Sequence, residues 1–374
     1  MKRILFLVSS MQGGGAERVA ALLCNQWVRR GYEVTLMPTF SGRGDCLYPL
    51  EERVGLDYLA DHVSSRGGSA LNKLQRLLAL RCAIRKEAPD VIVSFLSHVN
   101  VAAVIAAWGL PVPVVVSERI YPPAMPLGAV LERLRRWAYP QADAVVVQTE
   151  QAREWLARCC PKAHGHVIAN PVVFPLPQGE PVVAPYSAID SQRRLVLAVG
   201  RLSPQKQFHE LIAAFEPLAA LFSDWDLLIL GEGPERESLE RQRERRGLKG
   251  RVHIPGRVGN LPDWYARAAV YVMSSRFEGF PNTLVEAMAH GLPAVSFDCD
   301  AGPRDIIRQG CDGYLVPLES GPTGLAHAVE RLMRDEAQRE TMAEAAVAVR
   351  ARFSMEHIAA EWDAVLGLTE ERDV

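Results

Sequence analysis

The chain has 374 residues, 48% of them apolar and 23% charged, which indicates a globular protein of two domains. A formal net charge of −2 excludes an overall electrostatic attraction to nucleic acid. The seven cysteines form no C-x-x-C pair, so they fit a reducing cytoplasm and argue against a structural zinc. The apolar run after the N-terminus is too short for a signal-peptide core or a membrane span, and we interpret it as a buried strand.

Strands and helices are predicted to alternate through the first part of the chain. Residues 4–8 form a continuous apolar run, as in a parallel strand buried on both faces, and a run of three glycines precedes a helical pattern. Alternation of this kind predicts an open, doubly wound α/β domain over residues 1–170. We expect further strands at 32–37, 91–95, 112–117 and 144–148, and helices at 16–29, 71–86 and 130–138.

Prolines crowd the stretch 171–192, which we interpret as a linker. The alternation then restarts and predicts a second Rossmann-like domain over 193–350, followed by a C-terminal helix, 351–374, that packs back on the first domain. Ligands of such sheets bind beyond the carboxyl ends of the strands, so we expect the site in a deep cleft between the domains. The strands of the second domain are expected at 195–199, 226–230, 252–254, 270–273 and 293–297.

Two cations follow the first predicted strand of the second domain. Arg201 and Lys206 are five residues apart in a strand-to-helix loop. A guanidinium, an ammonium and a helix N-terminus all stabilise negative charge, so this loop suits a diphosphate. The alternative is a pair of solvated loop cations.

The stretch SSRFEGFPNTLVEAMAHGLPAVSFD follows the strand at 270–273 and carries two glutamates. Glu278 lies in a loop, where a carboxylate can accept hydrogen bonds from sugar hydroxyls. The backbone N–H groups of residues 279–282 would face an anion above the next helix. Glu286 stands three residues after Thr283, the spacing of a capping box, which would explain Glu286 by structure alone.

Three features of the first domain follow its predicted strands. The glycine run allows close approach of the backbone to a ligand, but Glu17 and Arg18 stand where a dinucleotide fingerprint requires glycine. His98 follows the strand at 91–95, and Glu118 and Arg119 follow the strand at 112–117. Both clusters should lie at the same edge of the sheet, although a lone histidine is more often a packing residue.

The segments GRLSPQKQFHELIAAF, GEGPE, GRV and EGFPNTLVEAMAHGLPAVSFD, in this order, resemble glycosyltransferase family 4, and GGGAER matches the N-terminal glycine loop of that family. The resemblance implies the GT-B fold and a retaining transferase that moves a hexose or N-acetylhexosamine from a nucleotide sugar, with uridine as the expected base. SMQGGGAERVAALL, DVIVSFLSHVNVAA and VVSER resemble the bacterial enzymes that build lipid-linked oligosaccharides and O-antigens, N-acetylgalactosamine transferases among them. A glycan on polyprenyl diphosphate is the acceptor that this implies.

The resemblance also implies roles for individual residues. The diphosphate would be held by Arg201 and Lys206, the donor sugar by Glu278, and the ribose by Glu286. The implied catalytic residues are Arg201, Lys206, Glu278, His98 and Glu118. The implied donor-binding residues are Gly14, Gly15, Gly200, Arg257, Gly279, Phe280, Pro281, Asn282, Thr283 and Glu286. The residues that we expect to contact the acceptor or its lipid are Lys73, Arg76, Arg119, Arg133 and Arg136.

No metal ion or other cofactor is expected, because the two cations would carry the diphosphate charge. Asp298-Cys299-Asp300 has the D-x-D pattern of a metal-binding motif, but it follows a different strand from the one that precedes the diphosphate loop. Basic residues alternate with apolar ones at 71–86 and 130–138, which suits an anionic membrane surface, although a solvated basic helix face is the plain alternative. The expected location is the cytoplasm, at the cytoplasmic face of the inner membrane.

The residues alone leave other functions open. A nucleotide-sugar epimerase or hydrolase of the same fold would use the same diphosphate loop. A non-catalytic two-lobed sugar-binding protein would share the architecture. A dehydrogenase is disfavoured because the dinucleotide fingerprint is missing. The partners that we expect are a nucleotide sugar, a glycan acceptor and an anionic membrane, with no nucleic acid.

Overall fold

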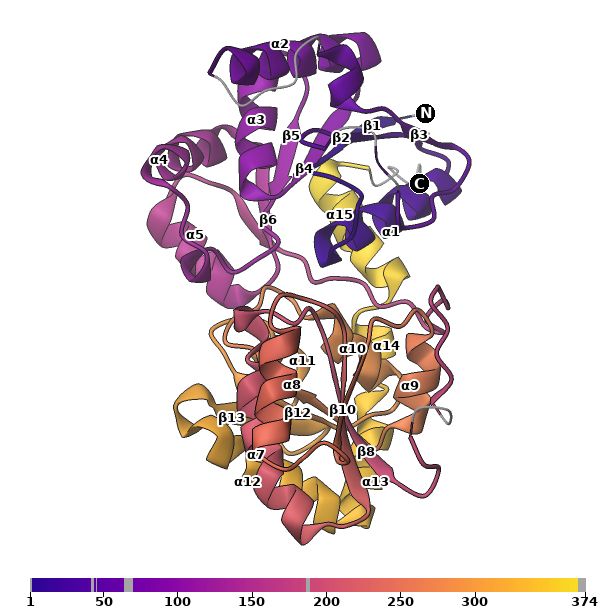
Figure 1. Cartoon of the computed structure of the whole chain (residues 1–374). Helices are drawn as coiled ribbons and strands as arrows, with labels where there is room; N and C mark the ends of the chain where they lie inside the picture. The colour runs from indigo at the N-terminus through magenta and orange to yellow at the C-terminus, as the bar shows by residue number, and fades with distance from the viewer. Residues whose placement is uncertain (1, 42–43, 45, 64–69, 186–188, 369–374) are drawn as a thin grey trace. The chain divides into compact units, whose positions relative to one another are not determined.

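The computed structural model describes residues 2–41, 44, 46–63, 70–185 and 189–368 (Figure 1). The chain divides into two compact units. Unit 1 comprises Met1–Pro171 and Met355–Val374, and unit 2 comprises Val172–Ser354. Each unit is a parallel sheet with helices packed on it, so the predicted α/β class is confirmed.

Unit 1 is built on a seven-stranded parallel sheet of order β3-β2-β1-β4-β5-β6-β7. Its central strands β1, β4 and β5 are buried except at Arg3, because helices cover both faces of the sheet, and this is why they read as continuous apolar runs. The short strands β3 and β7 were not expected from the sequence. The strands are β1 (Arg3–Val8), β2 (Glu33–Pro38), β3 (Val54–Leu56), β4 (Val91–Phe95), β5 (Val114–Ser117), β6 (Ala144–Val147) and β7 (Gly165–Val167). The helices are α1 (Gly15–Arg29), α2 (Ala70–Glu87), α3 (Ser97–Ala107), α4 (Ala129–Ala138), α5 (Glu150–Cys159) and α15 (Met355–Leu366).

The last helix, α15, completes the core of unit 1 although it is distant in sequence (Figure 1). Trp362 is fully buried, and its ring lies 6.4 Å from that of Trp27 and 5.8 Å from that of Phe95. Trp27 Nε1 donates a hydrogen bond of 2.9 Å to Asp363, which also forms an ion pair with Arg30. Burial of this aromatic cluster therefore fixes α15 to α1.

Unit 2 is built on a six-stranded parallel sheet of order β10-β9-β8-β11-β12-β13. The direction in which strands are added reverses between β8 and β11. The strands are β8 (Arg194–Val199), β9 (Trp225–Leu230), β10 (Val252–Gly256), β11 (Val270–Met273), β12 (Ala294–Asp298) and β13 (Gly313–Pro317). The helices are α7 (Phe208–Leu221), α8 (Arg236–Arg245), α9 (Leu261–Arg267), α10 (Asn282–Ala289), α11 (Pro303–Ile306), α12 (Gly321–Arg334), α13 (Glu336–Ala346) and α14 (Val349–Arg352).

The segment predicted as a linker lies against unit 2 over much of its described length. The Val172 N–H donates to the carbonyl of Phe353 at 2.7 Å, and the Gly179 N–H donates to that of Gly259 at 2.9 Å. Gly259 in turn donates to Pro181 at 2.7 Å. Residues 186–188 of the predicted linker lie outside the described part of the chain.

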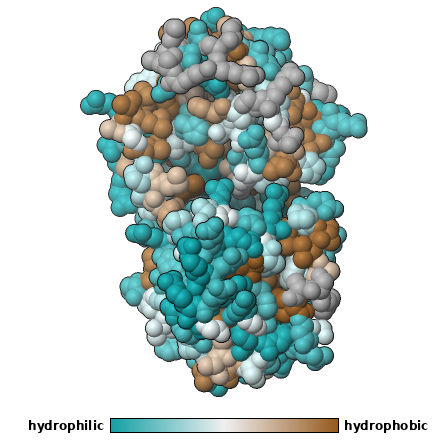
Figure 2. All heavy atoms as spheres, in the orientation of Figure 1, coloured by the Kyte–Doolittle hydropathy of each residue, from teal (hydrophilic) through white to brown (hydrophobic). Residues whose placement is uncertain are grey.

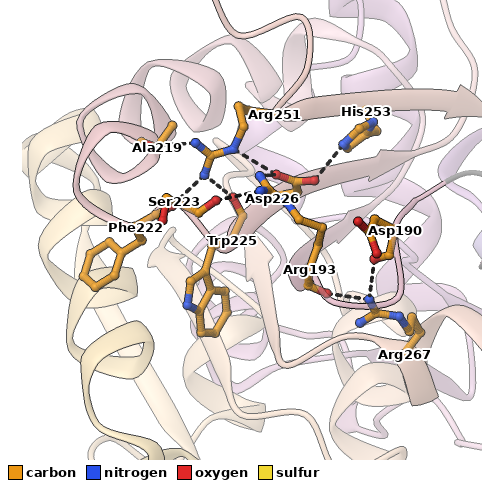
Figure 3. A network of polar contacts seen from close by, with 10 residues as sticks. All are labelled: Asp190, Arg193, Ala219, Phe222, Ser223, Trp225, Asp226, Arg251, His253 and Arg267. Carbon is orange, nitrogen blue, oxygen red and sulfur yellow. Dashed lines mark hydrogen bonds and ion pairs between the residues drawn. The ribbon is translucent and has the colours of Figure 1, made fainter.

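A buried carboxylate gathers three basic side chains at the start of β9 (Figure 3). Asp226 accepts hydrogen bonds from Arg193, from Arg251 at 3.0 Å and from His253 at 3.0 Å. Burial raises the pKa of Asp226, but the hydrogen bonds from His253, Arg193 and Arg251 outweigh it and lower the pKa to about 2. Arg251 also donates to backbone carbonyls at the end of α7 and in the turn after it, so the cluster ties this helix to β9 and β10.

Candidate donor site in unit 2

The predicted donor-binding residues of unit 2 lie in loops that leave the carboxyl ends of its strands. In open α/β sheets, ligands bind at the point where the strand order reverses, here between β8 and β11. The loop after β8 carries Arg201 and Lys206, and the loop after β11 carries Glu278. The topology therefore brings the two conspicuous sequence motifs to the same place.

Lys206 and Glu278 form an ion pair across this point. Lys206 Nζ lies 2.7 Å from Glu278 Oε1, and the two side chains are only 17% and 9% exposed. Because water is largely excluded, the pair interacts more strongly than a surface ion pair would. The arrangement offers one cation and one carboxylate side by side, which suits a ligand with a phosphate next to hydroxyl groups.

Three hydrogen bonds to backbone carbonyls join the two loops. Ser274 Oγ donates to the Lys206 carbonyl at 2.8 Å, and the Arg276 N–H donates to the Gln205 carbonyl at 2.8 Å. Gln205 Nε2 donates to the Phe277 carbonyl at 2.9 Å. These bonds hold the ion pair in a fixed geometry, as a preorganised site requires. The roles of Gln205 and Ser274 were not predicted from the sequence, because their partners are about seventy residues away along the chain.

Gln207 has left-handed backbone dihedrals, φ 47° and ψ 40°, directly before α7. A non-glycine residue rarely adopts this conformation, and such residues concentrate at functional sites. It lets the chain turn sharply from the segment that carries Lys206 into the helix. The sequence offers no signal for it, because asparagine, aspartate or glycine is the residue usual at such a position.

The glycines of GEGPE allow the loop after β9 to pack against the Arg201 loop. A Cβ at Gly231 would lie 1.9 Å from the carbonyl oxygen of Gly200, and a Cβ at Gly233 would lie 2.3 Å from that of Leu202. The Leu202 N–H also donates to the Glu232 carbonyl at 2.9 Å. Close backbone packing is thus the reason for both glycines, and it supports the loop from which the exposed Arg201 projects.

The predicted capping box of α10 is wrong. The helix begins at Asn282 with Pro281 in the N-cap position, so Thr283 already lies inside it. The Thr283 hydroxyl accepts a hydrogen bond from the Tyr271 hydroxyl at 2.8 Å and donates one to the Val199 carbonyl at 3.4 Å. These two bonds join α10 to the sheet. Glu286 is buried and accepts a hydrogen bond of 3.2 Å from the Tyr265 hydroxyl.

Two other predicted donor-binding residues, Gly279 and Arg257, lie in the loops before α10 and after β10. A Cβ at Gly302 would approach the Gly279 carbonyl to 2.7 Å, so the loop after β12 packs on the segment that precedes α10. Asp298 forms an ion pair of 2.9 Å with Arg304, which gives this carboxylate a structural partner. Arg257 is exposed directly after β10.

In unit 1, the glycine loop and His98 follow β1 and β4. Tyr48 fastens the loop, because its hydroxyl accepts from the Gly14 N–H at 3.1 Å and donates to the Gly14 carbonyl at 2.9 Å. Gly15 begins α1. His98 Nε2 lies 3.2 Å from Ser9 Oγ, and burial lowers the pKa of this histidine, which favours the neutral ring at neutral pH.

Glu118 and Arg119 are both part of the interior of unit 1. Glu118 accepts hydrogen bonds from Ser97 at 2.8 Å and from the Tyr139 hydroxyl. Burial raises the pKa of Glu118, against the opposing effect of Tyr139 and Arg135. Arg119 donates to Asn170, and its guanidinium lies 4.2 Å from the centre of the Phe95 ring. Arg119 is thus held by partners within unit 1, and its predicted contact with the acceptor or its lipid stays a prediction.

The remaining predicted acceptor residues lie on α2 and α4. Lys73 is exposed, and Arg76 is half-buried, where it donates to the Thr39 carbonyl and lies over the Phe40 ring. Arg133 and Arg136 are exposed on α4. The ligand-binding roles assigned from the sequence to both units stay predictions.

Two family models match the two parts of the chain. Residues 13–173 match the model described as Glycosyltransferase Family 4, and residues 184–349 match that of Glycosyl transferases group 1. By these two matches the chain is a glycosyltransferase, with the family 4 model over its first part. The predicted family is therefore confirmed.

This transferase is similar along its whole length to curated bacterial proteins. It is 27% identical to the amylovoran biosynthesis glycosyltransferase AmsD of Erwinia amylovora, over 98% of this chain and all of that protein. It is 28% identical to a Campylobacter jejuni α-1,4-N-acetyl-D-galactosaminyltransferase, over 97% of both chains. The name of that enzyme specifies an acceptor on undecaprenyl diphosphate.

A solved structure shows the same fold. HepE of Anabaena, determined in complex with UDP, matches with a TM-score of 0.83 and 22% identity, over 99% of this chain and all of that chain. The GT-B fold predicted from the sequence is thereby confirmed.

Proposed function

We propose that the protein is a retaining glycosyltransferase that moves a hexose or N-acetylhexosamine from a UDP-sugar to a glycan on polyprenyl diphosphate, in the assembly of a surface polysaccharide. The observation that carries this proposal is the Lys206–Glu278 pair where the strand order of unit 2 reverses. It sets a cation for the diphosphate beside a carboxylate for the sugar hydroxyls. The UDP bound to HepE and the acceptor named for the Campylobacter enzyme support the donor and the acceptor.

In this proposal, the donor binds across the loops of unit 2. Its diphosphate lies at Arg201, Lys206 and the N-terminus of α10, where backbone N–H groups and the helix dipole favour an anion. Glu278 accepts hydrogen bonds from the sugar, and Glu286 binds the ribose. Lys206 then lies between Glu278 and the diphosphate, so its ammonium group has anionic partners on both sides.

The proposed reaction proceeds on one face of the donor sugar. The bond between the anomeric carbon and the diphosphate oxygen breaks, and a bond from this carbon to the acceptor hydroxyl oxygen forms on the same face. The acceptor proton passes to the departing diphosphate oxygen. Negative charge grows on the diphosphate, so Arg201 and Lys206 stabilise the transition state more than the bound substrate. These cations supply the charge that a metal ion would otherwise supply.

The first test is a titration of nucleotide sugars by calorimetry. One UDP-sugar should bind, and Glu278→Ala should weaken it at least about tenfold, because the sugar loses a charged hydrogen-bond partner worth roughly 1.5–3 kcal/mol. Binding should be unchanged in excess EDTA. A mixture of donor and acceptor should then release UDP, whereas an epimerase or hydrolase would convert the donor alone. A donor affinity that is unchanged by Glu278→Ala would contradict the assigned site.

We also propose that the protein binds an anionic membrane surface through α4. Val130 and Trp137 are 76% and 42% exposed on this helix, next to the exposed Arg133 and Arg136. Figure 2 shows apolar side chains, in brown, gathered at the left of unit 1, where Figure 1 places α4. Across the described residues, no helix is both long and apolar enough to cross a membrane. Apolar and basic side chains on one exposed helix suit binding in the interface of an anionic bilayer.

Reversal of two charges on α4 should reduce binding to vesicles of phosphatidylglycerol. Each basic residue near an anionic surface contributes about 1 kcal/mol, so Arg133→Glu with Arg136→Glu should weaken binding at least about thirtyfold. Sedimentation with vesicles measures this. Arg241→Glu with Arg245→Glu on α8 changes the net charge equally and serves as the control. Equal losses in the two double variants would show that overall charge, and not α4, governs binding.

A further inference from the structure

A cavity of about 600 Å³ lies within unit 1, lined by residues of α2, α3 and α4. Its size is within the range of pockets that hold small ligands. Most of the lining residues are apolar, and they include Leu77, Leu80, Val101, Ala102, Ile105 and Leu131. The cavity reaches the surface, because the lining residues Val130 and Leu134 are exposed.

Two cationic side chains, Lys73 and Arg76, and the neutral ring of His98 also line this cavity, and Arg76 and His98 pack against one aromatic ring. The Arg76 guanidinium lies 5.5 Å from the centre of the Phe40 ring, and the His98 ring packs edge-on against Phe40 at 4.5 Å. Lys73 is exposed three residues before Arg76 on α2, so the two lie on the same face of that helix. Charge and apolar surface are therefore segregated within the cavity.

The basic side of the cavity adjoins the carboxyl edge of the sheet. His98 Nε2 lies 3.2 Å from Ser9, which directly follows β1 and precedes the glycine loop. Substrates of parallel α/β sheets bind at this edge. A ligand in the cavity would thus have its charged end toward the substrate region and its apolar part between α2, α3 and α4.

We propose that this cavity holds the first isoprenoid units of the acceptor lipid, with the lipid diphosphate at Lys73 and Arg76 and the attached sugar toward His98. The inference rests on the proposed function, because it assumes a lipid-linked acceptor. An anion joined to a branched hydrocarbon complements a cavity with cations on one side and apolar walls elsewhere. The chain of a membrane phospholipid is the competing occupant, and the experiment below separates the two.

The test is calorimetric titration of the full-length protein with farnesyl diphosphate and with inorganic diphosphate, both in saturating UDP. UDP fills the donor site, so that the probes report another site. Farnesyl diphosphate should bind at least about tenfold more tightly, because its hydrocarbon leaves water. Equal affinities would overturn the proposal.

Filling the cavity should abolish this preference. Ala102→Phe places a ring in the cavity and should reduce the affinity for farnesyl diphosphate at least tenfold while leaving inorganic diphosphate unchanged. Ala157→Phe adds the same ring at an exposed position on α5 and should have no effect. Leu134→Gln, at a partly exposed lining position, should act in the same direction and guards against misfolding of the first variant. Unchanged binding of farnesyl diphosphate to Ala102→Phe would overturn the proposal.

Two further readouts separate the possible causes of failure. Ala102→Phe should bind phosphatidylglycerol vesicles as the wild type does. A loss of vesicle binding would instead assign the cavity to phospholipid chains. Titration of the wild-type protein with UDP-sugars tests the proposed function separately. If UDP-sugars bind but farnesyl diphosphate binds no more tightly than inorganic diphosphate, only the cavity proposal is refuted. If UDP-sugars do not bind, only the donor site is refuted.

Discussion

Replacement of Lys206 by alanine should lower kcat/KM for glycosyl transfer by about a thousandfold. The loss of one preorganised group that stabilises developing charge commonly costs about 10²–10³ in rate, and here the substitution also leaves Glu278 without its cation. The effect should fall on kcat at least as strongly as on KM, because the charge on the diphosphate is larger in the transition state than in the bound donor.

Steady-state kinetics with the donor found by calorimetry measure this effect. Lys249→Ala removes an exposed lysine of unit 2, whose side chain is 78% exposed, and should leave the kinetics unchanged. Lys206→Arg restores the positive charge with a different shape and should recover part of kcat. If Lys206→Ala were to retain wild-type kcat, the diphosphate would lie elsewhere and the role of the Lys206–Glu278 pair would have to be abandoned.

Replacement of Asp226 by asparagine should lower the free energy of unfolding of unit 2 by about 3 kcal/mol. Removal of one partner from a buried charge cluster is strongly destabilising, typically by about 3–5 kcal/mol, because the remaining charges stay buried without compensation. Arg193 and Arg251 keep backbone partners in this cluster, which is why we expect the lower end of the range (Figure 3). Urea unfolding measures the change.

Asp224→Asn is the matched control for this prediction. Asp224 is 57% exposed and lies 3.9 Å from Arg194, so the loss of its charge should change stability by less than about 0.5 kcal/mol. Donor affinity should survive in folded Asp226→Asn, because Asp226 is at the amino end of β9 and Lys206 follows the carboxyl end of β8. A stability loss no larger than that of Asp224→Asn would contradict the structural role of the cluster.

The contribution of Asp226 should also depend on pH with a defined sign. Its pKa is lowered from 3.8 to about 2 in the folded protein, so the carboxylate form is favoured by folding. The stabilisation is therefore complete above about pH 4 and is lost as the pH falls through 2. The difference in unfolding free energy between wild type and Asp226→Asn should accordingly shrink between pH 4 and pH 2.

Several features of the site could be predicted because they depend on residues that are consecutive in the sequence. The apolar run of β8 followed by Arg201 and Lys206, and that of β11 followed by Glu278, place each side chain at the end of a buried strand. Strand and helix periodicity is local, so it can be recognised in the sequence without knowledge of the fold. The capping box of α10 was predicted from the spacing of neighbouring residues in the same way. It is wrong, because Thr283 bonds to the sheet and does not cap its own helix.

By itself, the sequence determined the α/β class, the family and the loops that carry the candidate donor site, because these depend on patterns within short segments. Only the tertiary structure decided which groups meet. The Lys206–Glu278 pair joins residues 72 positions apart, and Trp27 meets Asp363 across 336 positions. The left-handed backbone of Gln207 has no signal in the sequence, and the cavity beside Phe40 arises only when distant elements pack. Contacts of this kind depend on the packing of whole elements, which no local residue pattern specifies.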